Sequence, residues 1–369
     1  PPRKSLRGDF RGFLTARDGD KARLPHSLFG KESLYLHDLN PSEMKRILPI
    51  GILLMLSYSL PAFGTSSPRP AGMTVETCTV DGLERTYRLY LPEGVPDDAP
   101  LVFVLHGYGG NFNLDRYGMN EAADRHGFAV CYPQGVKDGR GKTCWNVGYP
   151  FQADMTVDDV SFLCELAGLL QDKYGLSRKN TFCTGMSNGG EMCYLLAYSR
   201  PDVFAAVAPV SGLTLEWMYR DCDTPAPIPL FEIHGTEDRT SAWEGDLENK
   251  GGWGAYLLVE IAVGYWVAAN RCVREQTDTL ALRRHPVVAH RFVGGTGGNE
   301  VWLYEVVDGG HSWAEKDMDT SEEIWRFLGR SVKWARAAVR GGAGVRRPVP
   351  SFLVRYLDDS GQRLKIIRL

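Results

Sequence analysis

Ser187 lies in the glycine-rich hexapeptide GMSNGG at residues 185–190. Residues 181–184 before it are typical of a strand and residues 191–198 after it of a helix, which is the context of a nucleophile elbow. Glycines flank the serine of an elbow because a Cβ there would strike the adjoining strand or helix, and the helix N-terminus favours developing negative charge. The pattern predicts a nucleophilic Ser187, and the alternative interpretation is a structural glycine-rich turn.

A serine hydroxyl is a poor nucleophile at neutral pH, so it needs a base, and the base needs a carboxylate that orients it. In hydrolases with this elbow, the acid and then the histidine follow the serine along the chain. His311 follows a predicted strand at residues 301–307 and lies in a glycine-rich turn that lets the imidazole reach across the strand ends. His234 belongs to a strand, and His285 and His290 lie in a segment without this context. We therefore predict that His311 is the base.

The orienting acid is expected at the end of a neighbouring strand. Residues 230–234 form such a strand, which runs into a turn that contains Glu237 and Asp238. Successive residues that leave a strand point to opposite sides, and this favours Asp238 over Glu237 as the acid. The alternative interpretation is that Asp238 only caps the turn.

Acyl transfer also needs backbone N–H groups that stabilise an oxyanion. One normally comes from the residue after the nucleophile and one from the loop after an early central strand. Asn188 supplies the first N–H, and the loop at residues 106–111, directly after the apolar strand at 101–105, supplies the second. We expect Tyr108 to be the second donor and His106 to be structural, because His106 precedes the nucleophile in the chain.

These residues must be positioned by a sheet with helices around it. From about residue 74, strand-like and helix-like segments alternate as in an α/β sheet. The expected strands are residues 84–91, 101–105, 128–132, 181–184, 205–210, 230–234 and 301–307, and the clearest helix is 157–174. The run at 101–105 is apolar throughout, as in a central parallel strand covered on both faces. We predict an α/β-hydrolase fold, a mostly parallel sheet with helices on both faces, in a single catalytic domain at residues 70–332.

The chain resembles the secreted polyhydroxybutyrate depolymerase-like esterases, a group that overlaps with the feruloyl and acetylxylan esterases of carbohydrate esterase family one. The resemblance covers about residues 74–330 and rests on the motifs LHGYGGN (105–111), CWN (144–146), DDV (158–160), GMSNGG (185–190), HGTED (234–238) and GGHSW (309–313). It implies the triad Ser187, Asp238 and His311 and an acyl-serine intermediate, without a metal or an organic cofactor. The motifs do not separate feruloyl, acetyl and hydroxyalkanoate esters.

Two other functions share this layout. A prolyl oligopeptidase-like serine peptidase has the same catalytic order, but it would need a further propeller domain or a charged pocket for a peptide terminus. A non-catalytic binding protein of the same fold usually lacks a triad member, whereas all three are present here. We therefore expect a small or oligomeric ester substrate, which includes esters linked to a polysaccharide.

Tryptophans in loops are candidates for an aromatic acyl or sugar site. Trp145, Trp243 and Trp313 lie in predicted loops, as does Trp253, and we take the first three as candidate substrate contacts. The alternative is that loop tryptophans cover edges of the core. Two further tryptophans, at 266 and 302, lie on a predicted helix and a predicted strand and are expected in the core.

The charge balance and the cysteine spacing of the chain limit the kinds of partner that we expect. The 369 residues carry 42 Lys and Arg against 45 Asp and Glu, a formal net charge of −3. Nucleic-acid binders usually present a basic face, so we expect no nucleic acid. C-x-x-C spacings are absent from the sequence, which argues against a structural zinc site.

The N-terminal region has the layout of a secretory signal. Residues 44–64 begin at Met44 with two basic residues, continue with an apolar run and end in small residues. The apolar run is shorter than the roughly 20 residues that span a bilayer, so we expect a secreted or periplasmic protein without a membrane anchor. Residues 1–43 read as a segment upstream of the true start, and residues 333–369 as a linker and a short tail with a hairpin.

Overall fold

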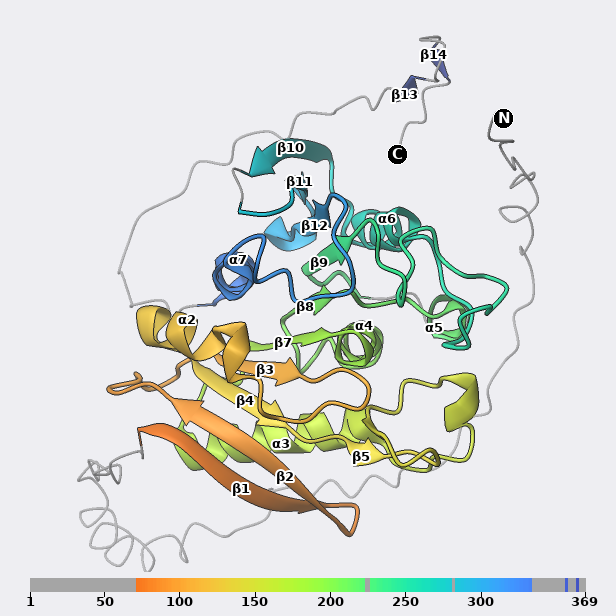
Figure 1. The fold of residues 1–369 in the computed structure, drawn as a ribbon. Coiled ribbons are helices and arrows are strands. Elements are labelled where there is room, and N and C mark those ends of the chain that lie inside the picture. The colour runs from red at the N-terminus through yellow and green to blue at the C-terminus, as the bar shows by residue number, and fades with distance from the viewer. Residues whose placement is uncertain (1–70, 223–225, 281–282, 334–355, 358–362, 365–369) are drawn as a thin grey trace, which may run out of the picture. The chain divides into compact units, whose positions relative to one another are not determined.

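The computed structural model describes residues 71–222, 226–280 and 283–333, together with the short antiparallel strands β13 (Tyr356–Leu357) and β14 (Arg363–Leu364) (Figure 1). These two strands form the hairpin that the sequence predicts in the tail. The segments predicted at 1–43 and 44–64 lie outside the described residues. Among the described residues, no helix is long and apolar enough to cross a bilayer.

A ten-stranded sheet organises residues 72–306, in the order β1-β2-β4-β3-β7-β8-β9-β12-β11-β10. Its strands are β1 (Gly72–Val80), β2 (Leu83–Leu91), β3 (Leu101–Leu105), β4 (Ala129–Pro133), β7 (Thr181–Met186), β8 (Ala206–Val210), β9 (Leu230–Gly235), β10 (Arg274–Leu280), β11 (Val287–Val293) and β12 (Val301–Val306). The six central strands from β4 to β12 are parallel, and the two strands at each edge are antiparallel. A separate pair is formed by β5 (Val136–Lys137) and β6 (Thr143–Cys144).

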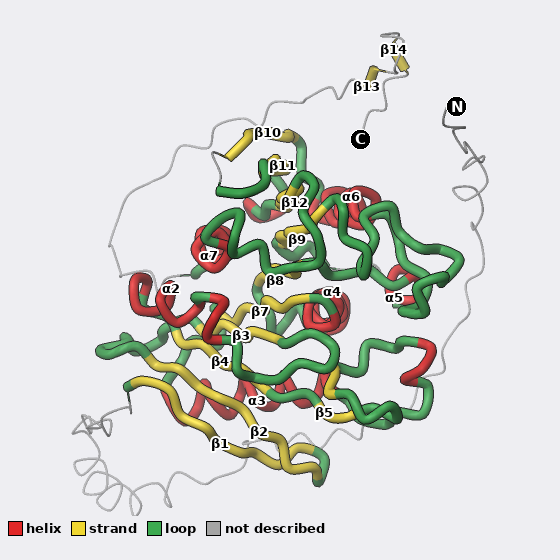
Figure 2. The backbone as a smooth tube through the Cα atoms, in the orientation of Figure 1, coloured by secondary structure: helices red, strands yellow, loops and turns green. Residues whose placement is uncertain are grey.

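Helices cover both faces of this sheet (Figures 1 and 2). They are α2 (Met119–His126), α3 (Asp159–Tyr174), α4 (Asn188–Ser199), α5 (Glu216–Asp221), α6 (Val259–Asn270) and α7 (Thr320–Leu328). Residues of α3, α4 and α6 share one buried cluster with one face of the sheet, and residues of α2 and α7 share a second cluster with the other face. In β3, Phe103 belongs to the first cluster and Val104 to the second, which is why the strand is apolar throughout.

The expected strands and the helix at 157–174 are present, and none of their ends differs from the prediction by more than two residues. The predicted α/β-hydrolase fold, with a mostly parallel sheet and helices on both faces, is therefore confirmed. The antiparallel strands β1, β10 and β11 were not predicted. In β10 the sequence REQTDTL is polar and exposed, so it lacks the apolar periodicity that marks a strand.

Parallel strands place their carboxyl ends at one edge of the sheet, and ligands of open α/β sheets bind there. The predicted nucleophile follows β7, the acid follows β9, the histidine follows β12 and the oxyanion loop follows β3. The topology therefore brings four chain segments that span more than 200 residues to the same edge.

Candidate active site

Ser187 stands between β7 and α4 with φ 57° and ψ −124°. A positive φ at a non-glycine residue is strained, and such strain is found at functional sites. The Ser187 N–H donates to the carbonyl of Val210 on β8, 2.9 Å away. A Cβ on Gly189 would lie 2.5 Å from the Leu105 carbonyl oxygen, and one on Gly185 would lie 2.7 Å from the backbone of Gly189. Both flanking glycines are therefore required by close backbone approach, as the sequence predicts.

Asp238 and His311 meet across 73 positions of the chain. His311 Nδ1 lies 2.7 Å from Asp238 Oδ2, and the other carboxylate oxygen accepts the N–H groups of Thr240 and Ser241, each at 2.8 Å. Burial alone would raise the pKa of Asp238, but its hydrogen bond to His311 and nearby imidazole charge hold that pKa below its ordinary value. Asp238 is 4% exposed, whereas Glu237 is on the surface, so the geometry favours Asp238 as the orienting acid.

Ser187 and His311 line the same cavity of about 410 Å³. Its other lining residues are His106, Gly107, Tyr108, Gly110, Asn111, Asn113, Leu114, Arg116, Tyr117 and Met186. Within the described residues, no hydrogen bond joins the serine hydroxyl to the imidazole, and such catalytic bonds often tighten only when substrate binds. With Nδ1 engaged by Asp238, Nε2 is the ring nitrogen left to take a proton from Ser187.

The oxyanion loop lies against the elbow. A Cβ on Gly107 would be 3.3 Å from the Ser187 Cβ. In the described part of the chain, the N–H groups of Tyr108 and Asn188 donate no hydrogen bond, so both are available to a ligand. The Asn188 side chain is fixed by two bonds to the backbone of Trp145, at 2.7 and 3.1 Å. This clamp orients the first turn of α4 beside the nucleophile.

His106 has a structural environment, in line with the sequence analysis. The ring is fully buried, Nδ1 lies 2.8 Å from the Gly107 carbonyl, and Nε2 accepts the Gly135 N–H at 2.9 Å. Burial lowers the pKa of His106 to about 4, so the ring is neutral at physiological pH. Its role is to hold the oxyanion loop in shape.

The three tryptophans expected as substrate contacts are buried, which corrects that expectation. Trp145 is 0% exposed, Trp243 is 7% exposed and Trp313 is 1% exposed, and none of them lines the cavity at Ser187. Trp145 donates its indole N–H to the carbonyl of His106 at 2.9 Å, so it supports the oxyanion loop from behind. The tryptophans at 266 and 302 are buried as predicted.

One aromatic side chain that lines the cavity, Tyr117, was not singled out by the sequence. Tyr117 lines the cavity and stacks on Trp313, with ring centroids 4.1 Å apart. Arg116 lines it as well. Both residues follow the predicted oxyanion loop by a few positions, and only their closeness to that loop could have indicated them.

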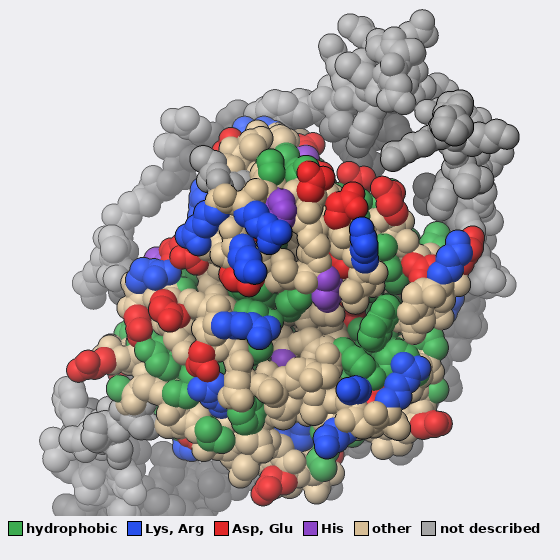
Figure 3. Space-filling model, viewed as in Figure 1, with side chains coloured by type: hydrophobic (Ala, Val, Ile, Leu, Met, Phe, Trp, Pro, Cys, Tyr) green, Lys and Arg blue, Asp and Glu red, His purple; other side chains and the backbone are tan. Residues whose placement is uncertain are grey.

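A partly exposed aromatic cluster adjoins the oxyanion loop. Tyr108 contacts Trp253 edge to face with centroids 5.3 Å apart, and Phe151 lies 5.6 Å from Tyr108 and 5.8 Å from Trp253. Trp253 is thus the loop tryptophan placed beside the site. On the face shown in Figure 3, hydrophobic and basic side chains surround the histidines at its centre.

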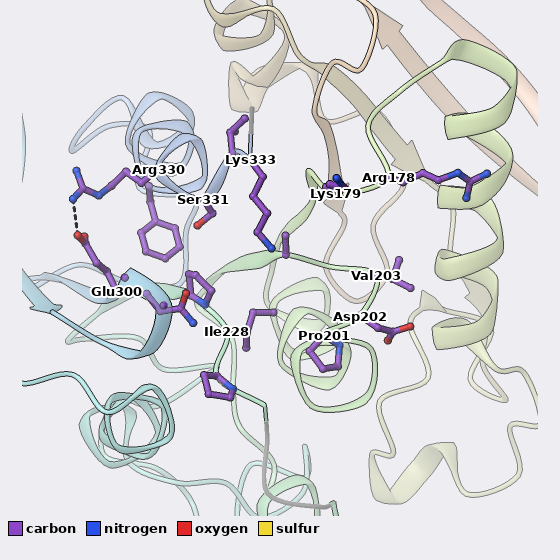
Figure 4. Close-up of a pocket in the computed structure, with 18 residues that line it drawn as sticks. Arg178, Lys179, Pro201, Asp202, Val203, Ile228, Glu300, Arg330, Ser331 and Lys333 are labelled. Atoms are coloured by element: carbon purple, nitrogen blue, oxygen red, sulfur yellow. Dashed lines mark hydrogen bonds and ion pairs between the residues drawn. The ribbon is translucent and has the colours of Figure 1, made fainter. Parts of the chain in front are cut away.

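A larger cavity of about 890 Å³ lies at the opposite end of the strands. Pro229 and Glu300, which line it, directly precede β9 and β12, and Lys333 extends into it (Figure 4). It contains no serine and histidine pair, so the catalytic geometry belongs to the smaller cavity. Among the described residues, no cluster of three His, Cys, Asp or Glu side chains could hold a metal ion.

Comparison with known proteins agrees with the motifs. Residues 85–220 match the family model described as esterase PHB depolymerase. The putative esterase NocK of Nocardia uniformis subsp. tsuyamanensis is 33% identical over 47% of this chain and 51% of its own length. Poly(3-hydroxyalkanoate) depolymerase C of Paucimonas lemoignei is 26% identical over 48% of this chain and 42% of its own. The chain thus spans about half the length of these two relatives.

Fungal relatives extend the comparison. Feruloyl esterase C of Emericella nidulans is 29% identical over 55% of this chain and 73% of its own length. The solved acetyl xylan esterase from Aspergillus awamori aligns with 69% of this chain and 99% of its own, at 14% identity and a TM-score of 0.49. The bifunctional acetylxylan esterase/xylanase XynS20E of Neocallimastix patriciarum is 27% identical over 46% of this chain and 24% of its own length. The sequence matches confirm the resemblance to the polyhydroxybutyrate depolymerase-like, feruloyl and acetylxylan esterases.

Proposed function

We propose that this chain is a carboxylic ester hydrolase that acts through an acyl-Ser187 intermediate. The observation that carries the proposal is that Ser187 and His311 line the same cavity. Ser187 stands there on its strained elbow, and the Nδ1 of His311 is engaged by Asp238. The esterase family model and the names of the relatives support the same class of reaction.

In the proposed mechanism, His311 Nε2 takes the proton of the Ser187 hydroxyl as its oxygen attacks the ester carbonyl carbon. The resulting oxyanion is stabilised by the N–H groups of Tyr108 and Asn188. The tetrahedral intermediate collapses, and the alcohol leaves with the proton held by His311. Water then attacks the acyl-serine, His311 takes one of its protons, and the acid leaves while Ser187 regains its hydroxyl proton. Asp238 keeps the imidazole oriented and stabilises its protonated form.

The proposed substrates are feruloyl or acetyl esters of plant polysaccharide, or hydroxyalkanoate esters. Curated relatives named for each of these ester classes support this range. The signal-like segment at residues 44–64 supports secretion, which would place the enzyme beside such extracellular substrates.

The test is hydrolysis of p-nitrophenyl acetate, methyl ferulate, acetylated xylan and 3-hydroxybutyrate oligomers by the full chain and by Ser187→Ala. We expect the substitution to abolish turnover with every active substrate. Ser199→Ala, at the exposed end of the same helix, is the matched control and keeps full activity. Activity that survives in Ser187→Ala would overturn the mechanism, and cleavage of peptide substrates alone would favour the peptidase.

A further inference from the structure

His234 is a fully buried histidine with a hydrogen-bond acceptor at each ring nitrogen. It lies on β9, four positions before the proposed acid. Its Nδ1 is 2.8 Å from Glu232 Oε1, and its Nε2 is 2.8 Å from the carbonyl oxygen of Ser241. Both His234 and Glu232 are 0% exposed at their side chains.

The contacts fix where the protons lie. A carbonyl oxygen only accepts, so the Nε2 of His234 carries a hydrogen. One further proton is shared between Nδ1 and the carboxyl group of Glu232. Glu232 also accepts the hydroxyl of Tyr194 at 2.9 Å and the N–H of Gly212 at 3.3 Å. Burial raises the pKa of Glu232 above its ordinary value, and the contacts from His234, Tyr194 and Gly212 oppose that shift and favour the ionised carboxylate.

Other charged or titratable groups around this pair come from several elements. They are Glu191 and Tyr194 on α4, Asp238 in the loop after β9, Glu305 opposite His234 on β12, and His311 beyond Asp238. Glu305 is engaged by His290, 3.5 Å away. Burial raises the pKa of Glu191 to about 8, which leaves that group largely protonated near neutral pH. The carboxylate nearest to His234 apart from Glu232 is therefore Asp238.

Asp238 lies between two imidazoles. Its Oδ2 is 2.7 Å from His311 Nδ1 and 3.7 Å from His234 Nε2. We propose that His234 is a positioning residue for the proposed triad, an imidazolium held by Glu232 that keeps Asp238 ionised and moderates the basicity of His311. The inference rests on the proposed function of Ser187, Asp238 and His311.

The charge of His234 acts in two ways at this distance. It stabilises the Asp238 carboxylate, and it opposes the positive charge that His311 gains when it takes a proton. Two charges in a buried site interact more strongly than in water. Burial alone would lower the pKa of His234, but the bond to Glu232 and the charges of Glu232 and Asp238 raise that pKa above its ordinary value.

The experiment is the pH profile of kcat/KM for the full chain with p-nitrophenyl acetate, compared with Glu232→Gln and His234→Gln. Glu232→Gln keeps the shape of the side chain, and His234 then becomes a neutral ring that still donates to Ser241. We expect the acid limb of the profile to move to higher pH by about one unit in both variants. His126→Gln, which removes a surface imidazole paired with Glu322, is the matched control and leaves the limb in place.

A purely structural role for His234 would lower activity without moving the limb, so an unmoved limb in active variants overturns the inference. The wild-type protein gives an independent measurement that needs no variant to fold. Nitrogen-15 chemical shifts of the histidine rings should show His234 protonated at both nitrogens from about pH 5 to 8, and a neutral ring would contradict the proposal. A different result would show that the proposed function is wrong, namely esterase activity that survives in Ser187→Ala.

Discussion

The backbone of Gly189, in the first turn of α4, lies against the carbonyl of Leu105 at the end of β3, so closely that a Cβ would stand 2.5 Å from the Leu105 oxygen. The atom nearest to such a Cβ belongs to the backbone, which cannot rotate away as a side chain would. The elbow that carries Ser187 is therefore wedged between α4 and the central strand.

Gly189→Ala should destabilise the protein by about 3 kcal/mol or more, because the added carbon forces two buried backbone segments apart. Thermal unfolding of the variant measures the effect. Gly264→Ala is the matched control: this glycine lies inside α6 with no atom near the position of a Cβ, and alanine there should stabilise by roughly 0.5–1 kcal/mol. Equal stability of Gly189→Ala and the wild type would contradict the close packing.

Asp238→Asn should reduce kcat by roughly 10³–10⁴-fold, because the amide does not hold His311 in the orientation and protonation state that the serine needs. Esterase assays at constant pH with p-nitrophenyl acetate measure this. Glu237→Gln, one residue earlier and on the surface, should keep activity within about twofold of wild type. The reverse pattern would transfer the role of the acid to Glu237.

Glu191 gives the stability of the protein a pH dependence. Tyr149 donates its hydroxyl to this carboxyl group, and burial raises the pKa of Glu191 from an ordinary 4.5 to about 8. Between these values the unfolded chain releases a proton that the folded chain keeps, so this contribution is complete below about pH 4.5 and is lost as pH rises to about 8. The midpoint of thermal unfolding of Glu191→Gln should increase relative to that of the wild type as pH rises from 5 to 8. A constant difference would mean that burial does not shift Glu191.

Because the cationic Arg116 lines the cavity at Ser187, we expect the enzyme to prefer esters that carry a negative charge. Asp and Glu are absent from the described residues that line the cavity at Ser187, and the Arg116 guanidinium lies over the ring of Tyr117, 5.1 Å from its centroid. The free acid of a 3-hydroxybutyrate trimer should have a higher kcat/KM than its methyl ester. Arg116→Gln should reduce that ratio about tenfold through KM, and Arg116→Lys should restore part of it.

The control for this prediction is Arg274→Gln, which changes an exposed arginine on the edge strand β10. It should leave the ratio of the two substrates unchanged. An equal loss in both arginine variants would indicate a general effect of net charge, and an unchanged ratio in Arg116→Gln would show that this side chain does not bind the carboxylate.

The placement of these candidate residues at one edge of the sheet was predictable from the sequence. Each of them, Ser187, Asp238, His311 and Tyr108, belongs to a short motif at the end of a recognisable strand. Local motifs report backbone geometry, and parallel strands then bring their ends together without further information. The tryptophan prediction was wrong for a related reason. Trp145, in a loop by sequence, is fully covered, and the burial of a loop side chain depends on contacts with segments far away in the chain.

The sequence by itself determined the fold class, the elbow of Ser187 and the candidate acid and base, since these follow from strand patterns and turn residues. Only the tertiary structure decided the surroundings of that machinery. It joined His311 to Asp238, covered Trp313 with Tyr117, and turned His234 from one more strand residue into a buried partner of Glu232. The physical reason is that hydrogen-bond partners and burial are set by residues that are distant in sequence and adjacent only after folding.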